Sequence, residues 1–222
     1  MRSHVEYRTK DGGIVPSVTQ VLKIISIPAL APAANRLGLL GINSNTYWKE
    51  LADIGTISHF LILCYLKKVK PDTSGYKKNL VDKAENSFLS YLDWEKNHKI
   101  EPVLLETPLV SEVFKFGGTP DCVCHLDDKE GLTLLDFKTG GIYKEHYWQI
   151  AGYTCLLEEN GYSIDDGIIL GIPRTVDEFF IEQEIEHIHI QASGLIPFLK
   201  CLELYNAIKD YEEATKEEKC PM

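Results

Sequence analysis

The sequence predicts one α/β domain with a helical N-terminal part, because the residue pattern changes near residue 100. Before that point apolar residues recur at helical spacing, and after it come short β-prone runs separated by turn-forming residues. The 222 residues can bury one substantial core, and no repeat or linker divides them. We therefore expect a single domain, with residues 1–100 mainly helical, 101–215 forming an α/β core and 216–222 forming a tail.

Three helices are expected in the N-terminal part. The first should begin at Ser17, because Ser17 and Gln20 match a capping box ahead of an apolar run. Pro28 and Pro32 should break that helix, since proline lacks the backbone N–H that a helix interior uses. The other two helices are expected over residues 46–67 and 77–98.

The second part should contain a β-meander followed by alternating helices and strands. Gly117-Gly118 and residues 127–131 are good turn sequences between its strands. The expected strands are 103–110, 112–116, 119–125, 132–137, 167–172 and 178–185, and the expected helices are 143–159 and 192–213.

Composition indicates an ordinary intracellular protein. Hydrophobic residues make up 44% and charged residues 25% of the chain. No apolar run approaches the roughly 20 residues that span a bilayer, and we expect no secretory signal because the N-terminal residues lack an apolar h-region. The six cysteines form no C-x-x-C pair and no disulfide framework, which favours reduced thiols and a cytoplasmic location.

The net charge of −10 is unevenly distributed. Residues 1–100 carry 14 Lys and Arg against 9 Asp and Glu, a balance of +5, whereas residues 101–222 carry 9 against 24, a balance of −15. Phosphate binding needs a local basic surface rather than a basic chain. The N-terminal part is therefore compatible with nucleic acid, and Arg36, Lys49 and Lys144 are candidate phosphate contacts from charge and position.

Asp136 and Lys138 are the residues most suggestive of chemistry. They are two apart on an expected strand, so both side chains leave the same face. An acid and a lysine at that spacing also make an ordinary surface ion pair. Asp121 on the preceding strand favours the functional interpretation, because two converging carboxylates are costly unless a cation neutralises them. Magnesium suits such a site, since it takes few carboxylates and completes its octahedron with waters and phosphate oxygens.

These residues resemble motifs of the PD-(D/E)XK nuclease superfamily. Gly55-Thr56-Ile57-Ser58-His59 is similar to the G-x-x-x-H segment of its RecB-type branch, which includes phage-type exonucleases and the mitochondrial genome maintenance exonuclease. Pro16-Ser17-Val18-Thr19 resembles the opening of several such exonucleases. The remaining matching segments are Gly118-Thr119-Pro120-Asp121, Leu134-Leu135-Asp136-Phe137-Lys138-Thr139 and Gln149-x-x-x-Tyr153.

The resemblance implies a restriction-endonuclease-like core, a central mixed β-sheet flanked by helices, and Mg²⁺ or Mn²⁺ as cofactor. Asp121, Asp136 and the backbone carbonyl of Phe137 would bind the metal. Lys138 would orient or deprotonate the attacking water and stabilise charge on phosphorus. The further implied site residues are His59 and, more weakly, Glu106 at the metal, and Gln149 and Tyr153 as residues that hold DNA or Lys138.

Each of these residues also has a structural interpretation. A histidine on an apolar helix, such as His59, is often only a satisfied core residue, and Gln149 and Tyr153 could simply cap a helix edge. Cys122 and Cys124 form a C-x-C without a second ligand pair, which makes a poor zinc site, so we expect them to pack in the core. Only Cys201 and Cys220 lie near the C-terminus, so we expect no iron–sulfur cluster.

The sequence thus predicts a metal-dependent DNA exonuclease that acts on single- or double-stranded ends in recombination, repair or replication, in a bacterial or phage-infected cell. The resemblance also allows a recombination or replication protein, or further copies of the chain, as partners. A structure-specific or restriction-type endonuclease on the same core is the first alternative. A nucleic-acid-binding module without catalysis is the second.

Overall fold

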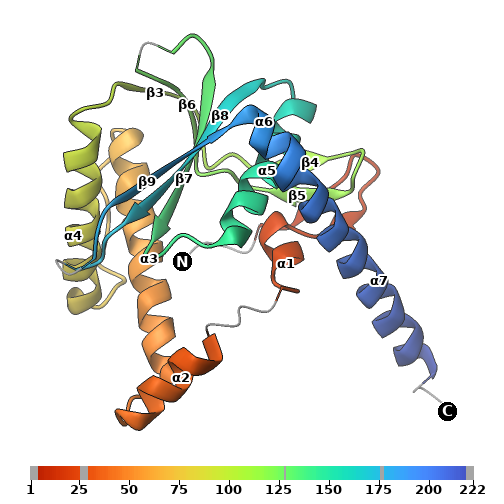
Figure 1. Ribbon diagram of the computed structural model, residues 1–222, viewed down its shortest axis with the longest axis horizontal. Helices are drawn as coiled ribbons and strands as arrows, with labels where there is room; N and C mark the ends of the chain where they lie inside the picture. Colours follow the sequence, from red (N-terminus) through yellow and green to blue (C-terminus); the bar gives the residue numbers. More distant parts are fainter. Residues whose placement is uncertain (1–4, 26–29, 128, 176–177, 219–222) are drawn as a thin grey trace.

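The chain folds around a five-stranded sheet that lies between two layers of helices (Figure 1). The computed structural model describes residues 5–25, 30–127, 129–175 and 178–218. The expected central mixed sheet flanked by helices, with a helical N-terminal part, is confirmed. The strands of the sheet, in spatial order, are β3 (Ile100–Leu105), β6 (Cys122–Leu126), β7 (Leu132–Thr139), β8 (Ile164–Ile172) and β9 (Ile181–Glu186).

The central strand β7 is parallel to its neighbour β8, and all other neighbours in this sheet are antiparallel. A parallel pair needs a long crossover connection, and the helix α5 (Lys144–Glu159) supplies it. The run Thr133 to Phe137 on β7 is fully buried, as expected for a strand that is covered on both faces. The chemistry-bearing residues Asp136 and Lys138 therefore sit on the most central strand.

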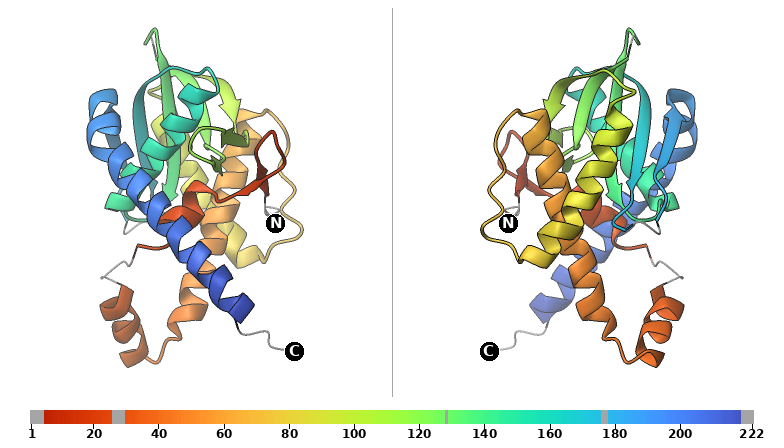
Figure 2. Two further views of the ribbon diagram at one scale, coloured as in Figure 1. Left: turned by 90° about the vertical axis from the view of Figure 1, so that its right-hand side faces the viewer. Right: turned by 90° about the vertical axis from the view of Figure 1, so that its left-hand side faces the viewer.

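Different helices cover the two faces of the sheet (Figures 1 and 2). On one face α3 (Ser44–Leu66) and α4 (Lys78–Glu95) bury Ile62 and Tyr91 against Leu135 and Phe137. On the other face α5, α1 (Val18–Leu22) and α7 (Ile196–Glu218) bury Leu156, Val18 and Phe198 in the cluster that contains Leu134. Alternate residues of β7 thus belong to different core clusters. Cys122 and Cys124 are fully buried in the first of these clusters, as expected for packing residues.

The N-terminal capping box is confirmed, but one helix is missing from the sequence prediction. Ser17 Oγ accepts the backbone N–H of Gln20 at 3.1 Å, and Gln20 Oε1 accepts the N–H of Ser17 at 2.8 Å. The helix that Pro28 and Pro32 were expected to break, α1, already ends at Leu22, and a further helix, α2 (Leu30–Leu39), contains Pro32. Pro32 lies in the first turn of α2, where backbone N–H groups have no intrahelical acceptor and proline is tolerated. Pro28 lies outside the described residues.

The expected strand 112–116 is wrong. Residues 112–115 form the turn between β4 (Leu109–Ser111) and β5 (Phe116–Gly118). Lys115 has a φ of 59°, in the left-handed region, and Ser111 Oγ accepts the N–H of Phe114. Glu159 of α5 accepts the N–H groups of Glu112 and Val113. Side chains remote in the sequence thus stabilise a turn that the β-prone residues do not suggest.

Two further differences lie at the ends of the chain. Short strands β1 (Tyr7–Arg8) and β2 (Ile14–Val15) pair near the N-terminus. The C-terminal helical run starts earlier than expected, with α6 (His187–His189) and a π-helical turn, η1 (Ile190–Leu195), before α7. A β-carbon on Gly194 would lie 2.7 Å from that of Ala151, so this glycine lets η1 approach α5 closely.

Helix α2 projects from the rest of the molecule beyond the end of the sheet at which β7 ends (Figures 1 and 2). None of its described side chains is buried, and Leu39 and the following Leu40 are 80% and 74% exposed. Among the described residues, no helix has both the length and the apolar character that crossing a membrane requires.

Candidate active site

The two acidic residues meet where β6 begins and β7 approaches its end. Cys122 pairs with Leu135 in the antiparallel β6–β7 hairpin, so Asp121 and Asp136 are the next residues outward on the two strands. The backbone N–H of Phe137 donates to Asp121 Oδ2 at 2.9 Å, which fixes that carboxylate against β7. Both carboxylates are buried, Asp136 almost completely. The hairpin therefore brings together the two principal candidate metal ligands.

Asp136 is held in an unfavourable environment. Burial raises the pKa of its carboxyl group above the ordinary value of 3.8, and the neighbouring Asp121 raises it further. Lys138 and His59 oppose this shift. Lys138 Nζ contacts Asp136 Oδ2, whereas Asp136 Oδ1 has no hydrogen-bond partner in the described part of the chain. A buried carboxylate oxygen without a partner is rare and marks a place where a cation would be stabilising.

His59 reaches the site from α3. Its Nδ1 lies 3.5 Å from Asp121 Oδ1, and its ring packs edge-on against Phe137 at a centroid distance of 5.9 Å. Gly55, one turn earlier on α3, makes this possible. A β-carbon there would lie 2.7 Å from Thr139 Oγ1, so a larger residue at this position would require the Thr139 side chain to move. This contact gives the glycine of the G-x-x-x-H segment a physical reason.

Gln149 and Tyr153 reach the same place from α5. Gln149 Nε2 donates to the phenol oxygen of Tyr153 at 3.0 Å. Burial raises the pKa of the Tyr153 phenol, and the nearby negative charges of Asp136 and Asp121 raise it further. The phenol therefore stays protonated beside the two carboxylates at neutral pH. The Tyr153 ring packs directly against Gly118 of β5, where a β-carbon would lie 2.8 Å from the ring. The position of the ring therefore depends on this glycine.

Replacing Gly118 tests this close packing. We expect Gly118→Ala to destabilise the protein by about 1–3 kcal/mol, because Tyr153 and Leu156 are buried and cannot move aside freely. Thermal unfolding measures the change. Gly38→Ala is the matched control, since no atom lies within 4 Å of a β-carbon at this position inside α2. The control should leave stability unchanged or raise it slightly, and an equal loss in both variants would contradict the packing argument.

Three residues near the site were not expected from the sequence. Tyr7 donates or accepts a hydrogen bond with Thr119 Oγ1 at 2.7 Å, and its ring covers Gly117. His146 has its pKa lowered to about 4 by burial and by the charge of Lys138, so it is neutral at pH 7. Arg174 approaches Gly140, just after β7, while it pairs with Glu178.

Only His146 had a detectable signal in the sequence, since it stands three residues before Gln149 and thus on the same helical face. Its Nδ1 accepts the backbone N–H of Tyr143 at 3.1 Å. In the neutral ring this leaves the proton on Nε2. Tyr7 and Arg174 lie in segments that match no motif and are brought in by the fold alone.

The remaining candidate residues lie apart from the carboxylate pair. Glu106 follows β3, its backbone N–H donates to the carbonyl oxygen of Asp121 at 3.0 Å, and it lines a pocket next to the site. Arg36 on α2 and Lys49 on α3 are exposed. Lys144, at the start of α5, is also exposed and lies 5.9 Å above the ring of Trp148. Their proposed contacts with DNA remain predictions.

The side chains at the hairpin suit a hard divalent cation whose shell is completed from outside the protein. Across the described residues, no three His, Cys, Asp or Glu side chains are arranged to hold a metal ion by themselves. Two carboxylates, one with an unpartnered oxygen, are nevertheless typical of magnesium sites that retain several waters and use substrate phosphate oxygens. Asp121 and Asp136 are therefore the residues that would bind the cation.

Comparison with known proteins gives fold-level likenesses only. No protein-family model matches the chain, and no curated protein matches its sequence. A crystal structure of SSO0001 is 16% identical, with a TM-score of 0.36, over 59% of this chain and 60% of that one. The chain thus spans well under two thirds of SSO0001.

Two further structures carry nuclease names. The alkaline exonuclease LHK-Exo from Laribacter hongkongensis, in complex with dAMP, is 12% identical with a TM-score of 0.40, over 71% of this chain and 83% of that one. A candidate exonuclease from Eubacterium rectale is 12% identical with a TM-score of 0.42, over 69% and 68%. These TM-scores are too low to support a function, which therefore depends on the side chains described above.

Proposed function

We propose that the chain is a Mg²⁺- or Mn²⁺-dependent nuclease that hydrolyses phosphodiester bonds in DNA. The observation that carries the proposal is the buried pair of carboxylates, Asp121 and Asp136, on adjacent strands, with Lys138 in contact with Asp136. Two acids and a lysine at one strand end are the residue types that metal-assisted hydrolysis of a phosphate ester uses. A structural ion pair with Lys138 alone would leave the buried, unpartnered Asp136 Oδ1 without explanation.

The residues of the site take complementary roles in this proposal. Asp121 and Asp136 would hold the cation, which when bound supplies Lewis acidity and lowers the pKa of a bound water. Lys138 would then turn from Asp136 towards the phosphate and stabilise the negative charge that develops on its oxygens. The protonated phenol of Tyr153, held by Gln149, remains a hydrogen-bond donor beside the carboxylates. Net hydrolysis adds one water across a P–O bond and yields a phosphate monoester and a hydroxyl group.

DNA ends are the substrate that we favour, with a role in recombination, repair or replication. The support is the order of the motifs from Pro16 to Tyr153, which resembles RecB-type exonucleases, together with the positive balance of residues 1–100. Arg36 on the projecting helix α2 and Lys49 in the first turns of α3 are exposed and available to phosphates. An endonuclease would use the same carboxylates, so the topology of the substrate must separate the two activities.

Digestion of three substrates tests the proposal. We expect end-labelled linear single- or double-stranded DNA to be shortened with Mg²⁺ or Mn²⁺ but not with EDTA, whereas covalently closed circular DNA stays intact. Nicking of the circular DNA would indicate that the protein is an endonuclease and not an exonuclease. DNA binding in a gel-shift assay without cleavage of any substrate under either metal would instead indicate a binding module that lacks catalysis.

A further inference from the structure

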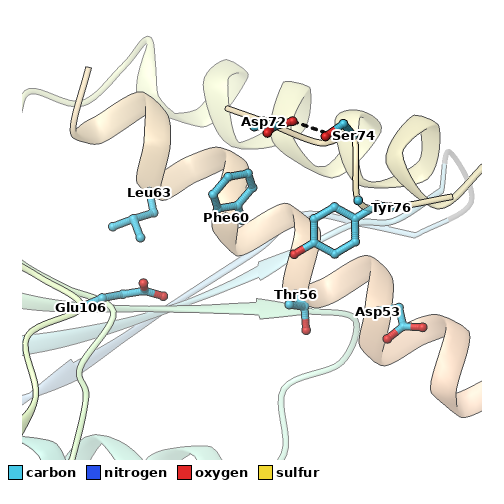
Figure 3. A pocket seen from close by; sticks show the side chains of 9 residues that line it. Asp53, Thr56, Phe60, Leu63, Asp72, Ser74, Tyr76 and Glu106 are labelled. Carbon is cyan, nitrogen blue, oxygen red and sulfur yellow. Dashed lines mark hydrogen bonds between the residues drawn. The ribbon is translucent and has the colours of Figure 1, made fainter. Parts of the chain in front are cut away.

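A pocket of about 840 Å³ lies along α3 and has no role in the proposed hydrolysis (Figure 3). One wall is a face of α3, a second is the connector between α3 and α4, and Glu106 closes the third side. The residues that line it are Asp53, Thr56, Phe60, Leu63, Asp72, Ser74, Gly75, Tyr76 and Glu106.

The pocket shares its walls with the candidate active site. Thr56 lies one helical turn before His59 on α3 and next to Gly55, which touches the end of β7. On the opposite side, the backbone N–H of Glu106 donates to the carbonyl oxygen of Asp121. A phosphate bound at Asp121 and Asp136 would therefore have this pocket as its neighbour, within the short reach of the nucleoside attached to it.

The lining selects against phosphate and favours a flat, partly apolar group. Among the described residues that line it, none is Lys, Arg or His and three are carboxylates, so an anion would be repelled. Asp72 accepts the N–H of Ser74 at 3.0 Å and is thereby engaged locally, as the dashed line in Figure 3 shows. Phe60, Leu63 and Tyr76 provide apolar and aromatic surface. Nucleobases combine π-faces that stack on aromatic rings with N–H groups that carboxylates and hydroxyls can accept.

We propose that this pocket receives the base of the terminal nucleotide of the DNA strand whose phosphate lies at Asp121 and Asp136. This inference rests on the proposed nuclease function and adds a second recognition site to it. Seating the terminal base would set the distance from the strand end to the bond that is cut. Stacking on an aromatic side chain is typically worth about 1–3 kcal/mol per base, which is about 5- to 150-fold in affinity.

A binding measurement tests the pocket without requiring hydrolysis. An oligonucleotide with 2-aminopurine at its terminal position is titrated with the full chain in Ca²⁺, a cation that carboxylate oxygens also bind, and its fluorescence should be quenched on binding. Phe60→Ala should weaken binding at least tenfold or abolish the quenching. Leu89→Ala, which truncates an exposed residue of α4 outside the pocket, is the control and should behave like the unsubstituted protein. Equal quenching and affinity in all three proteins would overturn the inference.

Hydrolysis by the unsubstituted protein provides a second test. Because the substrate is changed and the protein is not, a folding defect in a variant cannot influence the result. With Mg²⁺ or Mn²⁺, an oligonucleotide whose terminal nucleotide lacks its base should show about a tenfold higher KM than the intact one, while an abasic nucleotide far from the end should have no effect. Equal KM values for the abasic and intact ends would contradict the pocket assignment but would leave the proposed nuclease function intact. If no oligonucleotide is hydrolysed, the proposed nuclease function fails, whatever the 2-aminopurine titration shows about the pocket.

Discussion

Asp136→Asn should abolish DNA cleavage and at the same time make the metal-free protein more stable. Cleavage should fall by about 10³-fold or more, because one of the two carboxylates that would hold the cation is lost. Stability should rise because the buried Asp136 carboxylate faces Asp121, and their joint effect raises the pKa of Asp136 despite its contact with Lys138. Thermal unfolding in EDTA measures this gain, at about 2–4 °C in Tm for each kcal/mol.

The pH dependence of that gain identifies its cause. A carboxyl group whose pKa is higher in the folded protein than in the unfolded chain destabilises the fold when ionised, and this cost disappears as the pH falls towards the ordinary value of 3.8. The difference in Tm between Asp136→Asn and the unsubstituted protein should therefore be largest near neutral pH and shrink in acid. Added Mg²⁺ should raise the Tm of the unsubstituted protein more than that of the variant. A variant that is less stable at neutral pH would contradict the electrostatic account.

Lys138→Met should also abolish cleavage but should change stability in the opposite direction. Loss of the ammonium group should lower the rate by about 10²- to 10⁴-fold. In the absence of metal it also leaves the buried Asp136 carboxylate without its contact, at a cost of about 1–3 kcal/mol. Methionine retains much of the apolar stem, so the loss reports the charge rather than the packing.

The double variant separates the two effects. With Asp136→Asn already present, Lys138→Met should cost little stability, because no buried charge is left unpaired. Chemical denaturation of the four proteins in EDTA gives the coupling between the two positions. Stability changes that simply add would show that the contact between Lys138 and Asp136 contributes nothing, and the destabilisation would then have to arise elsewhere.

The sequence was sufficient to predict those parts of the site that depend on local order. Asp121, Asp136 and Lys138 lie on one hairpin, and a two-residue side-chain period places the latter two on one face. Gln149 and Tyr153 are one helical turn apart, so their hydrogen bond also follows from local geometry. Ser17 and Gln20 form the expected capping box for the same reason.

The parts that could not be predicted depend on contacts between distant segments. The turn at 112–115 exists because Glu159, more than 40 residues away, accepts its backbone N–H groups. Tyr7 reaches Thr119 from β1, and no residue pattern in the sequence predicts this contact. The prediction that Pro32 would break a helix failed for a different reason. Whether a proline ends a helix or stands in its first turn depends on where that helix begins, and α2 lacks an obvious start signal.

The hairpin geometry has a consequence for how such a site can vary. Asp121 and Lys138 mark out 18 consecutive residues that hold both acids and the lysine. One side chain that contacts them comes from far away, since His59 on α3 precedes its partner Asp121 by 62 residues. The two acids and the lysine are therefore encoded in a different stretch of the chain from His59, which contacts them. Substitutions at such contacting positions can therefore accumulate independently of the stretch that holds the two acids and the lysine.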